Sequence, residues 1–144
     1  MFKFKKITKA AFFVAFFTFS FQSPILLSAI DQTTWERIGV YDERTYYLNH
    51  ATSRHSGYRI QIWALTQLKE PAFTTRGRSY VSKKSLLEVD CHKKTLMILL
   101  DTWHPKPWGE GEPVFESDHS DMKPGIVQAQ SPSEAILRGA CGRR

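Results

Sequence analysis

Two cysteines, Cys91 and Cys141, constrain this chain of 144 residues more than any other feature. A lone pair of cysteines in an exported protein usually forms a disulfide, because the compartments outside the cytosol are oxidising. Such a bridge would close a loop of about 50 residues and stabilise the fold by roughly 4 kcal/mol. The alternative is two separate buried thiols. A zinc site is not expected, since these cysteines lack the close ligand spacing of such sites. If the chain is exported, we therefore predict a Cys91–Cys141 disulfide.

The first 29 residues have the layout of a secretory signal peptide. Four lysines precede an apolar run over residues 10–19, and small residues follow as far as Ala29. The alternative is a transmembrane anchor, which needs about 20 apolar residues, whereas Ser20 and Gln22 interrupt this run. We predict a signal peptide over residues 1–29 and one domain over residues 30–144. Ile30 stands where a lipoprotein would have its lipidated cysteine, so no lipid anchor is expected.

The charge of the chain gives little support for nucleic-acid binding. The net charge is +6, but four of the 20 Lys and Arg residues, and none of the 14 Asp and Glu residues, lie in 1–29. The remaining chain therefore carries only +2, and its basic character is mostly a targeting feature. We expect neither a nucleic-acid partner nor stable insertion in a membrane.

Most of the remaining chain carries the patterns of β-strands. Apolar and polar residues alternate over 58–65, and Leu87, Val89 and Cys91 share one face of a long extended segment. The polar segment 50–57 is typical of a hairpin connection. The continuous apolar run 96–100 indicates a central strand covered on both faces. The predicted strands cover residues 35–40, 45–49, 58–65, 80–91, 96–100 and 113–116.

One helix is predicted near the C-terminus. Ser131 fits the N-cap, Pro132 the first helical position and Glu134 the third, which together form a capping box. Ile136, Leu137, Ala140 and Cys141 then fall on one face, so a bridge to Cys91 would hold this helix on the sheet. The predicted fold is α+β: one antiparallel sheet of five or six strands, with a C-terminal helix on one face and one disulfide.

No enzymatic motif is present. The sequence lacks a nucleophile elbow, an His-Glu-x-x-His pair, a phosphate loop and a Cys-x-x-Cys motif. The polar segment 118–121 could bind a cation only if it folded back on itself, and we interpret it as a solvated loop. We predict that the protein is not an enzyme, has no metal site and needs no cofactor.

An ordered set of residues resembles a known family. The set is Trp35, Tyr46-Tyr47, Gly57, Trp63, Ser82-Lys83, Val89-Asp90-Cys91, Gly109 and Gly111 with Val114, Pro124-Gly125, Ser131, Glu134 and Cys141. In this set the chain resembles the surface-adhesin protein E family of Gram-negative bacteria over most of residues 35–141. The resemblance implies a six-stranded antiparallel sheet with one helix and a disulfide. It also implies dimers in some members, and binding of host extracellular-matrix or serum proteins by the adhesins.

Six cations and one tryptophan are candidate binding residues. Lysines and arginines gather in a stretch that contains only two acids, and a cluster of them could hold an acidic glycan or protein segment. The alternative is solubilising charge on an edge strand, where lysines block unwanted pairing; Lys83 and Lys84 would mark that edge or a bulge. Trp108 lies between proline and glycine in an exposed-looking loop, where it either contacts a partner or folds back onto the sheet, as Trp103 is expected to do. The candidates are Arg76, Arg78, Lys83, Lys84, Lys93, Lys94 and Trp108.

These observations favour an exported binding protein of the adhesin type, with a host matrix or serum protein as its partner. Contact with a glycan and formation of a homodimer are further expectations. The alternative is a periplasmic envelope or inhibitor protein with no host ligand. In either case the predicted location is the periplasm or the outer cell surface, without a lipid anchor.

Overall fold

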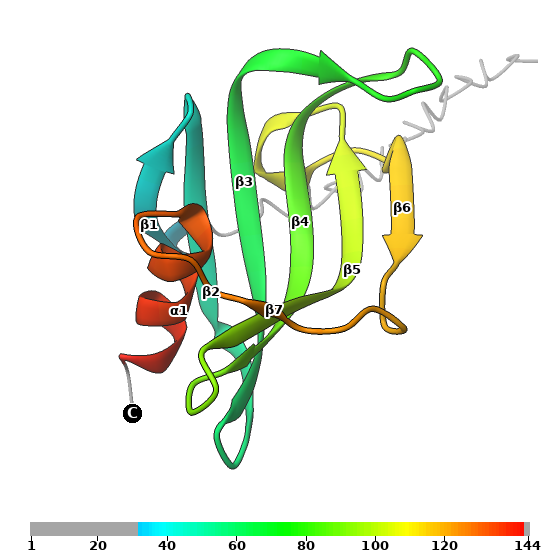
Figure 1. Cartoon of the computed structure of the whole chain (residues 1–144). Coiled ribbons are helices and arrows are strands. Elements are labelled where there is room, and N and C mark those ends of the chain that lie inside the picture. Colours follow the sequence, from blue (N-terminus) through cyan, green and yellow to red (C-terminus); the bar gives the residue numbers. More distant parts are fainter. Residues whose placement is uncertain (1–31, 143–144) are drawn as a thin grey trace, which may run out of the picture.

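The chain folds into one antiparallel sheet with one α-helix against one of its faces (Figure 1). The structure is a computed structural model, and it describes residues 32–142. The predicted signal peptide therefore lies outside the described residues. The strands are β1 (Trp35–Tyr41), β2 (Arg44–Ser56), β3 (Arg59–Phe73), β4 (Ser79–Asp90), β5 (Thr95–His104), β6 (Phe115–Asp118) and β7 (Gly125–Ile126).

Each of the first five strands pairs with the next one along the chain, so that β6 pairs with β5, and β7 also pairs with β5. This confirms the predicted fold class. Short 3-10 turns precede β1 (η1, Gln32–Thr34) and follow β5 (η2, Pro107–Gly109), and the helix α1 covers Pro132–Cys141. Within residues 32–142, no helix is long and apolar enough to cross a bilayer.

The polar segment 50–57 is not the predicted connection, because β2 continues through it as far as Ser56. The pairing register with β3 shifts between Asn49 and Arg54. Local hydrogen bonds hold this irregularity: the Asn49 carboxamide oxygen accepts from the Ala51 amide, and the Thr52 hydroxyl donates to the Asn49 carbonyl. Polar side chains that bond the nearby backbone thus produce a bulge inside a strand.

A second bulge explains the apolar run 96–100, for which coverage on both faces was the wrong interpretation. Leu86 pairs with Leu100 and Leu87 with Ile98, so Leu99 is an extra residue in β5. The bulge shifts the alternation by one position, and apolar residues on both sides of it therefore form one continuous run. The side chains of residues 96–100 stay only partly covered, and Ile98 is 38% exposed.

The core lies between α1 and one face of the sheet, which we call the helix face. The fully buried side chains Leu48, Ile60, Ile62 and Val89 form it together with Leu87, Ile136 and Ala140. Because α1 contacts β1, β2 and β3, it covers that side of the sheet and leaves the front of β4 and β5 without a helix (Figure 1). The helix therefore does not cover the apolar run of β5.

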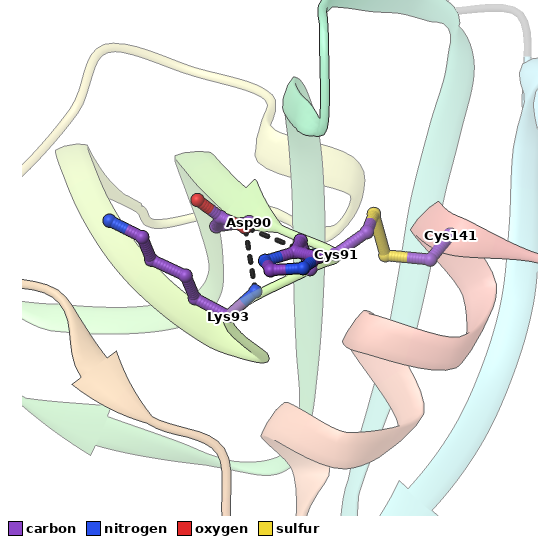
Figure 2. The surroundings of a disulfide bond; sticks show 5 residues. Asp90, Cys91, Lys93 and Cys141 are labelled. Atoms are coloured by element: carbon purple, nitrogen blue, oxygen red, sulfur yellow. Dashed lines mark hydrogen bonds between the residues drawn. A yellow bond between two sulfur atoms is a disulfide. The ribbon is translucent and has the colours of Figure 1, made fainter.

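The ends of α1 follow the sequence signals. The Ser131 hydroxyl accepts a hydrogen bond from the Glu134 amide, and the Glu134 carboxylate accepts one from the Gln130 amide. These bonds satisfy amide groups that a helix N-terminus leaves without partners. At the other end Cys141 forms the predicted disulfide with Cys91, across a sequence separation of 50 (Figure 2).

Candidate binding surface

The structure separates the six candidate cations into three groups. Arg76 and Arg78 lie in the turn between β3 and β4, whereas Lys93 and Lys94 lie in the turn between β4 and β5. These turns are at opposite ends of β4, whose 12 residues span roughly 40 Å. The expectation that the cations cluster at one end of the sheet is therefore wrong.

Lys83 and Lys84 are neighbours in β4 and point to opposite faces of the sheet. Lys83 pairs with Thr66 of β3 and lies on the helix face, whereas Lys84 pairs with the buried Leu65 on the other face. Since β4 runs between β3 and β5, these lysines mark neither an edge strand nor a bulge. The sequence pattern missed this because strand order depends on pairing between distant segments.

The Lys83 ammonium lies over an aromatic ring. Its Nζ is 3.9 Å from the centroid of the Trp103 ring and 5.3 Å from that of Tyr80. A cation over a ring face is attracted by the negative charge of that face, typically by about 1 kcal/mol or more when partly buried. Burial lowers the pKa of Lys83, the nearby Arg44 charge lowers it further, and Asp101 acts in the opposite direction.

Trp103 is the centre of a stack of rings, and this places it on the sheet rather than in solvent. Its ring centroid is 4.6 Å from that of Tyr80 and 4.4 Å from that of Phe115. Its indole Nε1 donates to Asp101 Oδ2 at 3.0 Å. Phe115, in the outer strand β6, is 36% exposed and forms the outer end of the stack.

Phe115 is also close to the β3–β4 turn. A hollow of about 230 Å³ lies between the turn residues, which include Arg76 and Arg78, and the segment 114–116. Phe73 ends β3 immediately before this turn and is 68% exposed. Two exposed aromatic side chains and two arginines therefore occupy one end of the sheet. We call Phe73, Arg76, Arg78 and Phe115 the aromatic–basic surface.

Phe73, Phe115 and Arg44 were not identified from the sequence. A phenylalanine next to a turn carries no local sign that distinguishes an exposed ring from a buried one. Arg44 begins a strand that is distant in sequence from Lys83. Only the pairing of β2, β3 and β4 brings the two side chains to the same side of the sheet.

Trp108 folds back onto the sheet, on the face opposite α1. Its ring centroid is 5.1 Å from that of Tyr47, and its amide donates to the Gln67 side chain. The following residue, Gly109, has a φ of +69°, and a Cβ there would overlap the Lys84 side chain. Glycine is therefore required for η2 to lie this close to β4. The Trp108 ring stays half-buried.

The β4–β5 turn holds Lys93 and Lys94 on the outside of the molecule. Asp90 Oδ1 accepts hydrogen bonds from the amides of His92 at 3.0 Å and Lys93 at 2.8 Å (Figure 2). The bond from the Lys93 amide is the main reason that the pKa of Asp90 lies below 3.8. The turn is thus a tight, hydrogen-bonded connection, as the short spacing between Cys91 and Leu96 predicts.

The polar segment 118–121 is a hydrogen-bonded turn. Asp118 accepts a hydrogen bond from the Ser120 amide. The pKa of Asp118 is lowered mainly by a hydrogen bond from the Ser120 side chain and, to a smaller extent, by the bond from the Ser120 amide. In the part of the chain that the structure describes, no three His, Cys, Asp or Glu side chains come together in a way that could hold a metal ion.

The sequence matches one protein family. The model of the family described as surface-adhesin protein E matches residues 35–142. Among curated proteins, none matches the chain.

Two solved structures share the fold. Crystal form II of Haemophilus influenzae protein E has a TM-score of 0.54 and 12% sequence identity, and the match covers 73% of this chain and 91% of that chain. Protein E from non-typeable Haemophilus influenzae has a TM-score of 0.56 and 12% identity, and the match covers 77% of each chain. At this identity the likeness is evidence for the fold alone.

Proposed function

The chain belongs to the surface-adhesin protein E family, and on that premise we propose that it is an exported, non-enzymatic adhesin that binds a host extracellular-matrix or serum protein. We place the contact at the aromatic–basic surface. The observation that carries this choice is the exposure of Phe73 and Phe115 beside Arg76 and Arg78. Aromatic side chains and arginine are the residue types enriched where proteins bind one another.

The arrangement of this surface supports a protein partner rather than a small ligand. When a partner covers an exposed ring, the free energy of binding becomes more favourable by about 25 cal/mol for each Å² of apolar area removed from water. Phe73 is the more exposed of the two rings, so it has the larger area to bury. Phe115 is held from behind by Trp103 at 4.4 Å, so little side-chain entropy is lost when it is covered. The two arginines would then select a partner with acidic groups.

The test is a binding assay with two matched charge variants. The mature protein is passed over immobilised host matrix and serum proteins, and the protein that binds is used for the comparison. In the variant Arg76→Glu/Arg78→Glu we expect affinity to fall at least tenfold, which corresponds to about 1.4 kcal/mol. The control, Lys93→Glu/Lys94→Glu, changes the net charge equally at the far end of β4 and should leave affinity within about twofold.

Two results would refute the proposal. If no matrix or serum protein is retained, even at low salt, the protein is not a host adhesin. If the two double variants lose affinity equally, net charge rather than this surface controls binding. The variant Phe73→Ser is an independent check, because it removes the ring without changing the charge. Salt screens interactions between charges but not apolar contacts, so this variant should bind more weakly at any salt concentration.

The location of the protein separates this function from a role inside the envelope. We propose the outer surface, without a lipid anchor, as the site of action. Brief treatment of intact cells with a protease should then remove the protein. Survival of the protein until the outer membrane is opened would instead support a periplasmic protein with no host ligand.

Contact with an acidic glycan is a second expectation for the cations of β4. Lys83 and Lys84 face opposite sides of the sheet, so one glycan chain can lie against only one of them. Glycan binding at either face would be reduced by Lys83→Glu/Lys84→Glu. Unchanged retention of this variant on a heparin column would refute the use of both lysines.

A homodimer is the third expectation, and β1 is the strand that would support it. It pairs with β2 on one side only and forms an edge of the sheet, and its Val40 is 48% exposed. An exposed edge can pair with a second copy by adding strands to the sheet. We expect Val40→Pro to give a monomer by light scattering if β1 forms the contact, because proline removes a backbone donor.

A further inference from the structure

A groove of about 280 Å³ lies on the helix face, beside the part of β4 and β5 that α1 does not cover. One wall is the first turn and a half of the helix, where Ser133 and Ile136 line it. The other side is formed by Lys83 of β4 and Ile98 of β5. The volume is just below the usual range for ligand pockets, about 300–1,000 Å³. The groove therefore has room for a small molecule, and a folded partner does not fit inside it.

The polar end of this groove has an excess of positive charge. Lys83 and Arg44 both line it, and Asp101 is the only carboxylate among the lining residues of the described chain. Both oxygens of Asp101 already accept hydrogen bonds, one from the Ser85 hydroxyl and one from the Trp103 indole.

Within the described part of the chain, neither Lys83 nor Arg44 has a direct anionic partner. Over residues 32–142, the ion pairs are between other side chains. The ammonium of Lys83 rests on the Trp103 ring instead. Burial and the charge of Arg44 both disfavour its protonated form. A bound anion would offset both effects, because an opposite charge close to a half-buried cation stabilises the cation.

The other end of the groove is apolar. Leu87 and Ile136 belong to the core, and Leu96 and Ile98 extend the apolar surface along β5. Ile98 is 38% exposed, so it offers area that a ligand can cover. An apolar floor with a few placed polar groups is the usual composition of a small-molecule site.

We propose that this groove binds small amphipathic carboxylates, with the carboxylate between Lys83 and Arg44 and a hydrocarbon chain of about eight carbons over Ile98 and Ile136. Each part of the ligand matches one end of the groove. The cations supply charge-assisted hydrogen bonds to the carboxylate, and each buried methylene contributes about 0.8 kcal/mol. This site lies outside the aromatic–basic surface and does not depend on the adhesin function.

The test is a titration of the mature protein with octanoate, followed by NMR of the isoleucine methyl groups. We expect saturable shifts at Ile98 and Ile136. Acetate has the charge without the chain, and 1-octanol has the chain without the charge, so each should bind at least tenfold more weakly than octanoate. If either binds as tightly as octanoate, or if octanoate gives no saturable shift, the proposal is wrong.

The matched variants are Lys83→Met and Lys84→Met, which remove the same charge from neighbouring residues on opposite faces of the sheet. Lys83→Met should weaken octanoate binding at least tenfold, and Lys84→Met should leave it unchanged within about twofold. Equal losses in the two variants would overturn the assignment. Arg44→Gln is the second variant. Because the Arg44 side chain is exposed, this substitution should not disturb folding, and it can replace Lys83→Met if that variant does not fold. It should weaken octanoate binding in the same direction, and no effect would overturn the role of Arg44.

Discussion

The disulfide gives the sharpest prediction, since its contribution can be worked out from chain length alone. The double variant Cys91→Ala/Cys141→Ala removes a tie that spans 50 residues. The loop it opens contains β5, β6, β7 and most of α1. In the chain-entropy model, a loop of this length stabilises the folded state by about 4 kcal/mol. This is a large share of the 5–15 kcal/mol that typically separates folded from unfolded domains.

The expected result is a lower unfolding temperature with an unchanged native structure. For about 110 folded residues, 4 kcal/mol corresponds to a decrease of roughly 15–20 °C. Thermal unfolding followed by circular dichroism measures the decrease, and urea unfolding at 25 °C measures the free energy directly. The near-ultraviolet spectrum of the aromatic side chains should stay the same at low temperature, because the chain-entropy argument assigns the loss of stability to the greater freedom of the unfolded chain.

Reduction of the wild-type protein is the control for this prediction. Reduced wild type and the double alanine variant should lose similar stability, since both lack the bridge. Ile136→Ala provides a comparison, because it removes buried contacts of α1 while keeping the bridge, and it should cost about 2–4 kcal/mol. A difference of less than about 1 kcal/mol between the bridged and unbridged proteins would refute the loop-entropy argument.

Three further substitutions test individual contacts. Gly139→Ala would place a Cβ 2.8 Å from Cδ1 of the fully buried Leu48, and the overpacking should cost about 1–3 kcal/mol in urea unfolding, more than the helix propensity gained. Ser131→Ala removes the acceptor for the Glu134 amide and should cost about 1 kcal/mol by the same method; no change would contradict the capping role. Asp90→Asn keeps an oxygen for the two turn amides but loses the charge. Because the folded-state pKa of Asp90 is lowered, the stability difference from wild type should be present at pH 7 and vanish as the pH falls below 3.8; a difference that persists at lower pH would contradict this cause.

Local signals were sufficient for α1 and for the alternation in β4. The cap at Ser131 and the proline at 132 are neighbours in sequence, and the structure confirms the helix start that they predict. Alternation in β4 likewise depends on consecutive residues, and it correctly placed Leu87 and Val89 on one face, which the structure shows to be the core face. The cysteine pair is distant in sequence, but there was only one way to join two sulfurs.

The remaining features depend on pairing between distant strands. The bulge at Leu99 changes which residues of β5 lie on the helix face of the sheet, and nothing in the run 96–100 itself records that shift. The position of α1 over β1–β3, rather than over β5, depends on contacts between distant segments, such as that of Gly139 with Leu48. For the same reason the basic residues of the linear sequence, from Arg76 to Lys94, could not be divided among faces and ends before the strand order was known.

The position of the bridge also determines how the fold would respond to a mechanical load, such as flow acting on an attached cell. A pull between β1 and the end of α1 passes from Cys141 through the sulfurs to Cys91, at the end of β4. The segment between the two cysteines is bypassed and carries no tension while the bond is intact. Only about 60 residues can then be drawn out, to roughly 200 Å, compared with nearly twice that length without the bond. Because the groove and the aromatic–basic surface each take residues from both sides of the bridge, the bypassed segment alone would preserve neither site once the first strands had been pulled away.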